Sequence, residues 1–427
     1  MAQRGIREFD AKRMLTAGVS RYAGSTATCE ARLALVSPQS DLDAFPDAFP
    51  WLTETNLAVK PDQLFGKRGK NNLLLLDANW QDTKKWIEER RDQKETIIQN
   101  GNAITGILTH FLVEPFTPHT EEYYLAITTE REGDVIHFSP KGGVDIEELW
   151  DTVQEFRVPI LADVDDLHLE DELPIANLTD KNLISAFMKN LHKFFVDYHF
   201  TYLELNPFTL KDHQVVPLDC VARVDDAAVF QCMDKWGSLY FPTAFGTSRS
   251  VEEEHIKAID AETGASLKFN ILNPAGRIWL MVAGGGASVI YADTVVDLGY
   301  TEELANYGEY SGNPSTEETY EYTRTILQLM TRQKDQHGRN KYLIIGGGIA
   351  NFTDVAATFT GIIKAIEKYG DALKRVNTKI FVRRGGPNYK TGLDLMKRLG
   401  ERIGIPMEVY GPEMHMTRVV KLALEGE

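Results

Sequence analysis

The C-terminal part of the chain repeats one pattern three times: an apolar run, a glycine-rich turn and a helical stretch. The apolar runs span residues 277–283, 341–345 and 379–382, and their turns span residues 284–286, 346–348 and 383–388. Helical periodicity then predicts helices at about 287–298 and 351–369, a third ending near 403, and a last strand at 405–410. Strands that alternate with helices of this length predict a doubly wound parallel sheet, an α/β fold.

The glycine turns of such a sheet all lie at its carboxyl edge, where ligands bind. Helix N-termini at this edge present unpaired N–H groups and a positive dipole end, which favour anions. Ser288, Asn351 and Thr353 could donate hydrogen bonds or cap the helices, and Arg383 and Arg384 could grip carboxylate or phosphate. The pattern therefore favours a small, multiply charged anion, although the glycines could also serve only to permit tight turns.

The first half of the chain is less regular and predicts an α+β domain. We expect helices at residues 81–99 and 182–198, an acidic surface segment at 163–173, and strands at 111–116, 123–129, 200–208 and 214–221. The sequence FPTAFG at residues 241–246 is typical of a domain boundary. We therefore expect one domain at residues 1–241, divided near residue 110, and a second at 242–427.

Nucleotide binding in the first half would need a design other than a Walker loop, because no glycine-rich stretch carries the GK[ST] ending. Glu204 and Asn206 alternate along one expected strand, so they share a face, and Asp219 is expected on the next strand. Asn206 and Asp219 offer the hard oxygen ligands that Mg²⁺ prefers. Lys60 and Arg68 could hold phosphate oxygens. Asp and Asn near hairpins also commonly serve only to shape turns.

Bulk properties exclude several classes of protein. A net charge of −16 argues against nucleic-acid binding. Three cysteines without a CxxC pair indicate a reduced, intracellular setting. Charges interrupt the N-terminal segment, and the apolar stretch at residues 278–292 is too short to span a bilayer. We expect a cytoplasmic protein with no membrane partner.

Eight segments of the chain form recognisable motifs. They are NLAVKPDQL (56–64), EPFTPH (114–119), YLELNP (202–207), GASLK (264–268), VAGGGASV (282–289), ANYGEYSG (305–312), IANFT (349–353) and FVRRGGPNY (381–389). Together they resemble ATP citrate lyase, a family related to the beta subunit of succinyl-CoA synthetase. The resemblance covers nearly the whole chain and implies an N-terminal ATP-grasp domain followed by a flavodoxin- or Rossmann-like, citrate-binding domain.

The resemblance also implies roles for individual residues. ATP contacts are implied at Lys60, Arg68, Gly69, Pro115, Thr117 and Glu122. Ligation of Mg²⁺ is implied at Asn206 and Asp219, with a further cation contact around Asp260, Thr263 and Ala265. Citrate would be held by Gly312, Asn351, Phe352, Thr353, Tyr369 and Arg384, with Gly284, Gly285 and Gly286 close by. The catalytic role falls to Glu204, which would support a phosphohistidine of a partner.

The implied reaction is the ATP- and CoA-dependent cleavage of citrate to acetyl-CoA and oxaloacetate through phosphohistidine, citryl phosphate and citryl-CoA. Of the ten histidines, none lies in a glycine-flanked loop suited to carry the phosphate, and His337 in a charged hairpin is a poor candidate. We therefore expect a hetero-oligomer whose second subunit carries the histidine, most of the CoA site and a citrate-synthase-like part.

Three other functions remain compatible with the sequence. A citryl-CoA synthetase subunit would stop at citryl-CoA, and the chain alone does not separate it from a lyase subunit. A succinyl-CoA synthetase beta-type ligase fits less well, because a dicarboxylate needs fewer anion contacts than the glycine turns offer. A non-catalytic citrate or nucleotide sensor would use the same fold without chemistry, and the joint presence of Glu204, Asn206 and Asp219 argues against it.

Overall fold

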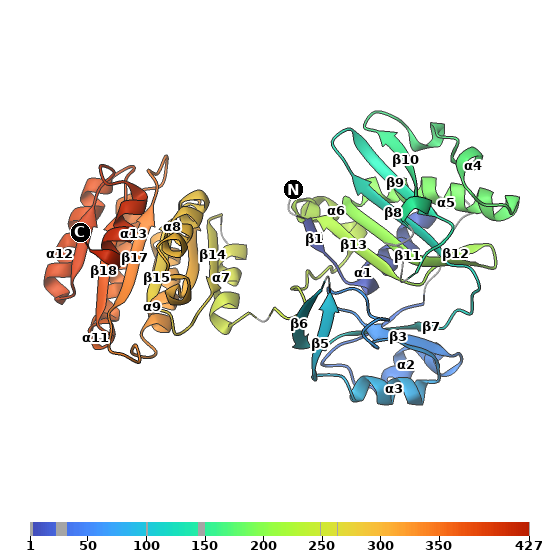
Figure 1. Cartoon of the computed structure of the whole chain (residues 1–427), viewed down its shortest axis with the longest axis horizontal. Coiled ribbons are helices and arrows are strands. Elements are labelled where there is room, and N and C mark those ends of the chain that lie inside the picture. The colour runs from blue at the N-terminus through green and yellow to red at the C-terminus, as the bar shows by residue number, and fades with distance from the viewer. Residues whose placement is uncertain are drawn as a thin grey trace. The chain divides into compact units, whose positions relative to one another are not determined.

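The computed structural model describes residues 3–22, 32–99, 101–143, 150–247, 249–262 and 264–426. The chain divides into two compact units, Met1–Ser248 and Arg249–Glu427. Figure 1 colours the first unit blue and green and the second yellow to red. Each unit has its own β-sheet structure and its own buried core.

An antiparallel sheet forms the larger part of the first unit. Its strands run in the order β1-β13-β11-β8-β9-β10, and β12 pairs with the last residues of β11. Their bounds are β1 (Gln3–Gly5), β8 (Tyr123–Thr129), β9 (Gly133–Ser139), β10 (Gln154–Pro159), β11 (Phe200–Lys211), β12 (Gln214–Pro217) and β13 (Cys220–Asp225). Four helices belong to this part, namely α1 (Glu8–Gly18), α4 (Leu169–Glu172), α5 (Leu178–Asp197) and α6 (Val229–Trp236).

Helices α1 and α5 supply apolar side chains to the core under this sheet. The side chain of Asn177 begins α5 as its N-cap, because it accepts a hydrogen bond from the N–H of Thr179. Buried residues of α5 such as Phe187 and Phe194 then pack in the same core as Leu203 and Leu205 of β11. The alternation along β11 leaves its other face free for polar side chains.

A smaller sheet in the first unit runs in the order β2-β7-β3-β4, next to the hairpin of β5 and β6. The bounds are β2 (Ala34–Val36), β3 (Leu57–Pro61), β4 (Leu75–Ala78), β5 (Lys94–Gln99), β6 (Asn102–Ile107), β7 (Phe111–Pro115), α2 (Phe45–Ala48) and α3 (Trp80–Glu88). Val59, Val113 and Ile87 share the core of this lobe. The first unit therefore consists of two lobes, each with its own sheet (Figure 1).

The second unit is built on a sheet of order β14-β16-β15-β17-β18-β19, parallel throughout except for the β14–β16 pair. The strands are β14 (Ser266–Ile271), β15 (Ile278–Ala283), β16 (Asn306–Ser311), β17 (Lys341–Gly347), β18 (Thr378–Arg383) and β19 (Met407–Tyr410). The helices are α7 (Val251–Glu262), α8 (Gly285–Asp297), α9 (Thr316–Met330), α10 (Val355–Lys368), α11 (Gly370–Arg375), α12 (Tyr389–Ile403) and α13 (Met416–Glu425).

Helices cover both faces of this sheet. Trp279 and Met281 of β15 belong to a core shared with α9, α10 and α12, whereas Ile278 and Leu280 belong to a core shared with α8 and α13. Successive side chains of a strand point to opposite faces, so this division places the two sets of helices on opposite sides. The predicted α/β fold with a doubly wound sheet is therefore confirmed.

Two expected elements of the first unit were wrong in extent. The helix expected at residues 81–99 ends at Glu88, and residues 94–99 form β5 instead. Asp92 has a left-handed backbone with φ of 63°, which ends any helical continuation. The strand expected at 214–221 is two strands, and Asp219 lies in the break between β12 and β13 rather than on a strand.

The long helix expected at residues 351–369 of the second unit starts later than predicted. Helix α10 begins at Val355, and the side chain of Asp354 caps it by accepting a hydrogen bond from the N–H of Ala357. Asn351 and Thr353 therefore lie in the preceding turn and do not cap the helix. Within the described ranges, no helix combines the length and the apolar character needed to cross a bilayer.

Candidate functional sites

A cavity of about 910 Å³ opens in the first unit and is lined by residues of both of its lobes. It brings together all nine site residues predicted for this half of the chain. They are Lys60, Arg68, Gly69, Pro115, Thr117, Glu122, Glu204, Asn206 and Asp219. We call this cavity the nucleotide cavity, after the ligand that the sequence predicts for it.

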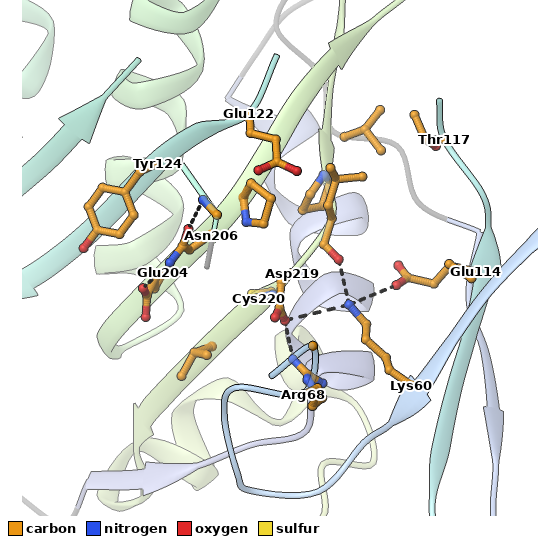
Figure 2. Close-up of a pocket in the computed structure, with 18 of the residues that line it drawn as sticks. Lys60, Arg68, Glu114, Thr117, Glu122, Tyr124, Glu204, Asn206, Asp219 and Cys220 are labelled. Atoms are coloured by element: carbon orange, nitrogen blue, oxygen red, sulfur yellow. Dashed lines mark hydrogen bonds and ion pairs between the residues drawn. The ribbon is translucent and has the colours of Figure 1, made fainter. Parts of the chain in front are cut away.

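The cationic side of the nucleotide cavity is a network of buried charges. Lys60 on β3 lies 2.6 Å from a carboxylate oxygen of Glu8 and 3.8 Å from Asp219. Arg68 lies 2.7 Å from the other oxygen of Glu8 and also pairs with Asp219. Figure 2 shows Lys60 and Arg68 pointing toward Asp219. Two cations therefore converge on one side of the cavity, each held by carboxylates.

Glu8, Lys12 and Glu114 complete this network, and the sequence did not predict a site role for any of them. The amine of Lys12 is fully buried and lies 2.8 Å from Glu8 and 2.7 Å from Glu114. Burial alone would lower the pKa of Lys12, but the charges of Glu114 and Glu8 raise it above its ordinary value. In the sequence, Glu8 and Lys12 are an ordinary i, i+4 helix pair, so no local signal marks them.

The anionic side of the cavity contains Glu204, Asn206 and Asp219. Glu204 and Asn206 share one face of β11 as predicted, and the hydroxyl of Tyr202 donates to Glu204 at 2.7 Å. The backbone N–H of Asn206 donates to the backbone oxygen of Asp219 at 3.2 Å, which fixes the two residues as neighbours. The oxygen of the Asn206 side chain accepts from the N–H of Gly143 at 2.8 Å (Figure 2).

The remaining lining residues enclose the cavity. Pro115 ends β7, and Thr117 follows it with a buried side chain. The carboxylate of Glu122 lies 3.0 Å from the ring of His119 and is partly exposed at the rim. Gly69 lies in the turn after Arg68, with open space where a side chain would be. These residues complete the lining of the cavity and give its rim one ionisable pair, Glu122 and His119.

A second cavity of about 300 Å³ lies at the carboxyl edge of the parallel sheet. We call it the edge pocket. Of the predicted citrate residues, its lining includes Gly284, Gly285, Gly286, Gly312, Phe352, Thr353 and Arg384. The structure thus brings the turns after β15 and β17 together with Arg384 after β18, as parallel strands require. Asn351 is exposed between lining residues of the same turn.

Tyr369 lies far from the edge pocket. It follows the last residue of α10, whereas the turn before α10 lines the pocket. A helix of 14 residues places its two ends about 21 Å apart. The structure therefore does not bring Tyr369 to the other predicted citrate residues.

Arg383 and Arg384 have different environments, although the sequence predicted one role for both. Arg383 donates to the backbone oxygens of Gly347, Met414 and Pro412, so it holds turns together. The guanidinium of Arg384 donates through Nη1 to the oxygen of Gly348 at 2.7 Å, and its buried Nε has no hydrogen-bond partner in the described part of the chain. Arg384 is therefore the arginine available to an anion.

Ser288 is also not available to a ligand. Its hydroxyl is buried and donates to the backbone oxygen of Gly284 at 2.8 Å. Serine in a helix often makes this bond to the preceding turn. The expectation that Ser288 adds a donor at the edge pocket was therefore wrong.

Asp260 and Ala265 lie in the second unit, whereas Asn206 and Asp219 lie in the first. The carboxylate of Asp260 accepts from the N–H of Leu267 at 2.7 Å and pairs with Lys268 at 2.6 Å. Thr263 falls outside the described residues. Among those that are described, no cluster of three or more His, Cys, Asp or Glu side chains is arranged to hold a metal.

Comparison with known proteins places both units in one family. Residues 2–236 match the family described as ATP-citrate synthase ATP-grasp domain, and residues 247–426 match the family described as ATP citrate lyase citrate-binding. The chain is 45% identical to ATP-citrate synthase alpha chain protein 2 of Arabidopsis thaliana over 425 residues, covering 100% of this chain and 99% of the relative.

Two further relatives show how the chain relates to longer and to solved proteins. It is 45% identical to human ATP-citrate synthase over 429 residues, which is 99% of this chain but 38% of the human protein. A structure of ATP citrate lyase from Methanothrix soehngenii in complex with citrate and coenzyme A is similar at a TM-score of 0.89 and 52% identity, covering 99% of this chain and 100% of that one. The chain therefore belongs to the ATP-citrate synthase (ATP citrate lyase) family, as a subunit with an N-terminal ATP-grasp part and a citrate-binding part.

Proposed function

We propose that the chain binds Mg-ATP in the nucleotide cavity and citrate in the edge pocket. A partner subunit would supply the histidine that carries the phosphoryl group and the site of citrate cleavage. The observation that carries the proposal is the presence of two cavities with different chemistry in one chain. The nucleotide cavity has two cations, Lys60 and Arg68, beside side chains with oxygen atoms that could bind a metal. The edge pocket has helix N-termini beside the buried Arg384.

The nucleotide cavity suits a triphosphate. Lys60 and Arg68 are already oriented by Glu8, so phosphate oxygens would meet two cations whose positions are fixed. Catalysis of phosphoryl transfer depends mainly on positioning the phosphates and neutralising their charge, and these two side chains would do both. Pro115 and Thr117 would contact the base, and Glu122 at the rim would contact the ribose.

Asn206 and Asp219 fit a magnesium ion that is shared with phosphates. They are neighbours, they line the same cavity, and they offer one carboxylate and one amide oxygen. Magnesium commonly takes one or two carboxylates from the protein and completes its shell with water and phosphate oxygens. The bound ion would neutralise phosphate charge. Asp219 would then exchange its pairing with Arg68 for the metal, leaving Arg68 to the phosphates.

Glu204 would orient the partner's histidine during phosphoryl transfer. Tyr202 holds its carboxylate at 2.7 Å, and it lies on the same strand face as Asn206. The γ-phosphoryl group would pass from ATP to the histidine nitrogen, releasing ADP, and then to a carboxylate oxygen of citrate. The thiolate of CoA would displace phosphate to form citryl-CoA, which is then cleaved to acetyl-CoA and oxaloacetate.

The edge pocket suits a carboxylate-rich anion. Helix α8 begins in the glycine turn at 284–286, which lines this pocket. The N-terminus of a helix favours negative charge. The guanidinium of Arg384 is buried against the pocket, and burial lowers the pKa of Arg384 from its ordinary value. No carboxylate pairs with Arg384 among the described residues, so an anionic ligand would supply the missing charge.

The relatives support the need for a partner. The Arabidopsis relative is an alpha chain of nearly the same length, and the matched part of the human enzyme is 38% of that protein. The remaining functions of the longer enzyme would therefore reside on a second polypeptide here. CoA would bind mainly to that partner.

Incubation with the natural partner subunit, ATP, CoA and citrate tests the proposal. Formation of acetyl-CoA is expected. Accumulation of citryl-CoA without acetyl-CoA would instead identify a citryl-CoA synthetase subunit. Thioester formation from succinate in place of citrate would identify a succinyl-CoA synthetase-type ligase. Failure of ATP to phosphorylate any histidine, with citrate binding intact, would indicate a sensor.

A further inference from the structure

Tyr310 and Arg384 both line the edge pocket, and Tyr310 carries a buried hydroxyl. We propose that this hydroxyl donates a hydrogen bond to a carboxylate group of citrate that Arg384 also holds, which makes Tyr310 a further determinant of substrate recognition. The inference rests on the proposed citrate site and adds a residue to it.

The location of Tyr310 follows from the sheet. It is the next-to-last residue of β16, and its backbone oxygen accepts from the N–H of Gly284 at 3.0 Å, where the glycine turn begins. Tyr310 is one of the residues that line the edge pocket; its side chain is 1% exposed, and its ring packs against that of Tyr322 with ring centres 6.1 Å apart. The backbone contact and the ring packing hold Tyr310 at the pocket wall.

The hydroxyl of Tyr310 has no hydrogen-bond partner within the described ranges. Buried hydroxyl groups are usually paired, and leaving one unpaired costs about 1–3 kcal/mol. The hydroxyl of Tyr322, a neighbour in the same core, is paired in this way: it donates to the backbone oxygen of Lys268 at 2.9 Å. An unpaired hydroxyl at a pocket wall therefore indicates a partner that arrives with the ligand.

Arg384 shares this property. Its Nε is buried and likewise unpartnered in the described part of the chain. Burial raises the pKa of Tyr310, and the positive charge of the nearby Arg384 opposes part of this rise. The phenol stays protonated at neutral pH and is a donor. A carboxylate has two oxygens with several acceptor positions, so one carboxylate group can accept from both a guanidinium and a phenol.

The test compares two tyrosine-to-phenylalanine substitutions in the full chain by calorimetric titration with citrate and by thermal unfolding. Tyr310→Phe should weaken citrate binding about tenfold or more, because it removes a bond to a charged group. Its melting temperature should stay equal or rise, because the lost hydroxyl bonds no described residue. Tyr322→Phe is the control: it should lower the melting temperature and leave citrate affinity unchanged, because its hydroxyl serves the fold.

Tricarballylate, which has the three carboxylates of citrate but no hydroxyl, identifies the group that Tyr310 contacts. Tyr310→Phe should weaken citrate and tricarballylate by the same factor. A loss confined to citrate would overturn the assignment to a carboxylate. Unchanged citrate affinity in Tyr310→Phe, with a wild-type chain that binds citrate, would overturn this inference alone. A wild-type chain that does not bind citrate would overturn the proposed site itself.

Discussion

The carboxylate of Glu8 lies 2.6 Å from the amine of Lys60. Glu8 belongs to α1, which packs in the core of the larger sheet, whereas Lys60 belongs to β3 of the smaller sheet. The charges of Lys12, Lys60 and Arg68 hold the pKa of Glu8 well below its ordinary value, although burial alone would raise it. The contact therefore joins the two lobes that line the nucleotide cavity.

Replacing Lys12 with methionine tests how much this network stabilises the fold. The substitution keeps the volume of the buried side chain but leaves Glu8 and Glu114 with one cation fewer. Breaking a buried charge network in this way costs about 3–5 kcal/mol, because an uncompensated charge stays buried. We expect a loss of that order in the free energy of unfolding, measured by urea denaturation.

Lys84→Met is the matched control for Lys12→Met. Lys84 on α3 pairs with Asp43, whose side chain is 85% exposed. Exposed ion pairs contribute little to stability, so the unfolding curve should hardly move. Equal losses in the free energy of unfolding for Lys12→Met and Lys84→Met would mean that the buried network stabilises the fold no more than an exposed ion pair does.

Asp62→Asn should change how stability depends on pH. Burial raises the pKa of Asp62 to about 6, and the negative charge of Glu8 adds to the shift. A carboxyl group whose pKa is higher in the folded than in the unfolded state contributes stability at low pH. This contribution is present below the unfolded pKa of about 4 and is lost as pH rises through about 6.

The asparagine variant lacks this titration. The free energy of unfolding of Asp62→Asn, relative to that of the native chain, should therefore rise by as much as about 3 kcal/mol from pH 4 to pH 7. This figure takes about 1.36 kcal/mol for each unit of pKa shift. The two oxygens of Asp62 accept from the N–H groups of Glu8 and Phe9, whereas asparagine has one acceptor oxygen and keeps only one of these bonds. This loss is the same at every pH and does not alter the difference in pH dependence. Denaturation curves at several pH values measure the difference, and parallel pH profiles for the two proteins would contradict the expectation.

Gly286→Ala separates binding from folding at the edge pocket. A methyl group at this second position of α8 would meet no atom within 4 Å, and the backbone is helical. Alanine should therefore stabilise the chain by about 0.5 kcal/mol through the unfolded state. Because Gly286 lines the edge pocket, a methyl group there would compete for space with a ligand held at the helix N-terminus, so citrate affinity should fall.

Gly370→Ala is the corresponding control. Gly370 begins α11, also with no atom within 4 Å of the added methyl group, and it does not line the edge pocket. We expect a similar gain in melting temperature and no change in the calorimetric citrate titration. If Gly286→Ala also leaves citrate binding unchanged, the ligand does not approach that helix N-terminus.

Strands β15, β17 and β18 of the parallel sheet could be predicted from the sequence because each is a continuous apolar run that leads into a glycine-rich turn. Residues 278–283 are buried at every position, as in a strand of a parallel sheet that is covered by helices on both faces. Strands β14 and β16 were missed, since the side chains of each alternate between buried and more exposed positions over only six residues. The turn after β12 was missed because the strand β11 changes partners there, which only the folded sheet determines.

The candidate sites were predictable where a motif fixes several residues at once, as with Glu204 and Asn206 on one face of β11. They were not predictable where the role depends on distant chain segments. Arg383 and Arg384 are adjacent and identical in type, yet one holds backbone turns and the other faces the pocket. Lys12 was missed for the same reason, because its partner Glu114 is remote in sequence.

The proposed function requires that one chain hold two separate anion sites, one in each unit. Calorimetric titration of Arg384→Ala and Asp219→Ala with Mg-ATP and with citrate tests it most directly. Arg384→Ala should lose citrate affinity about tenfold or more and keep Mg-ATP affinity within about twofold, and Asp219→Ala should do the reverse. Loss of both ligands in either variant, or of neither ligand in both variants, would contradict two separate sites.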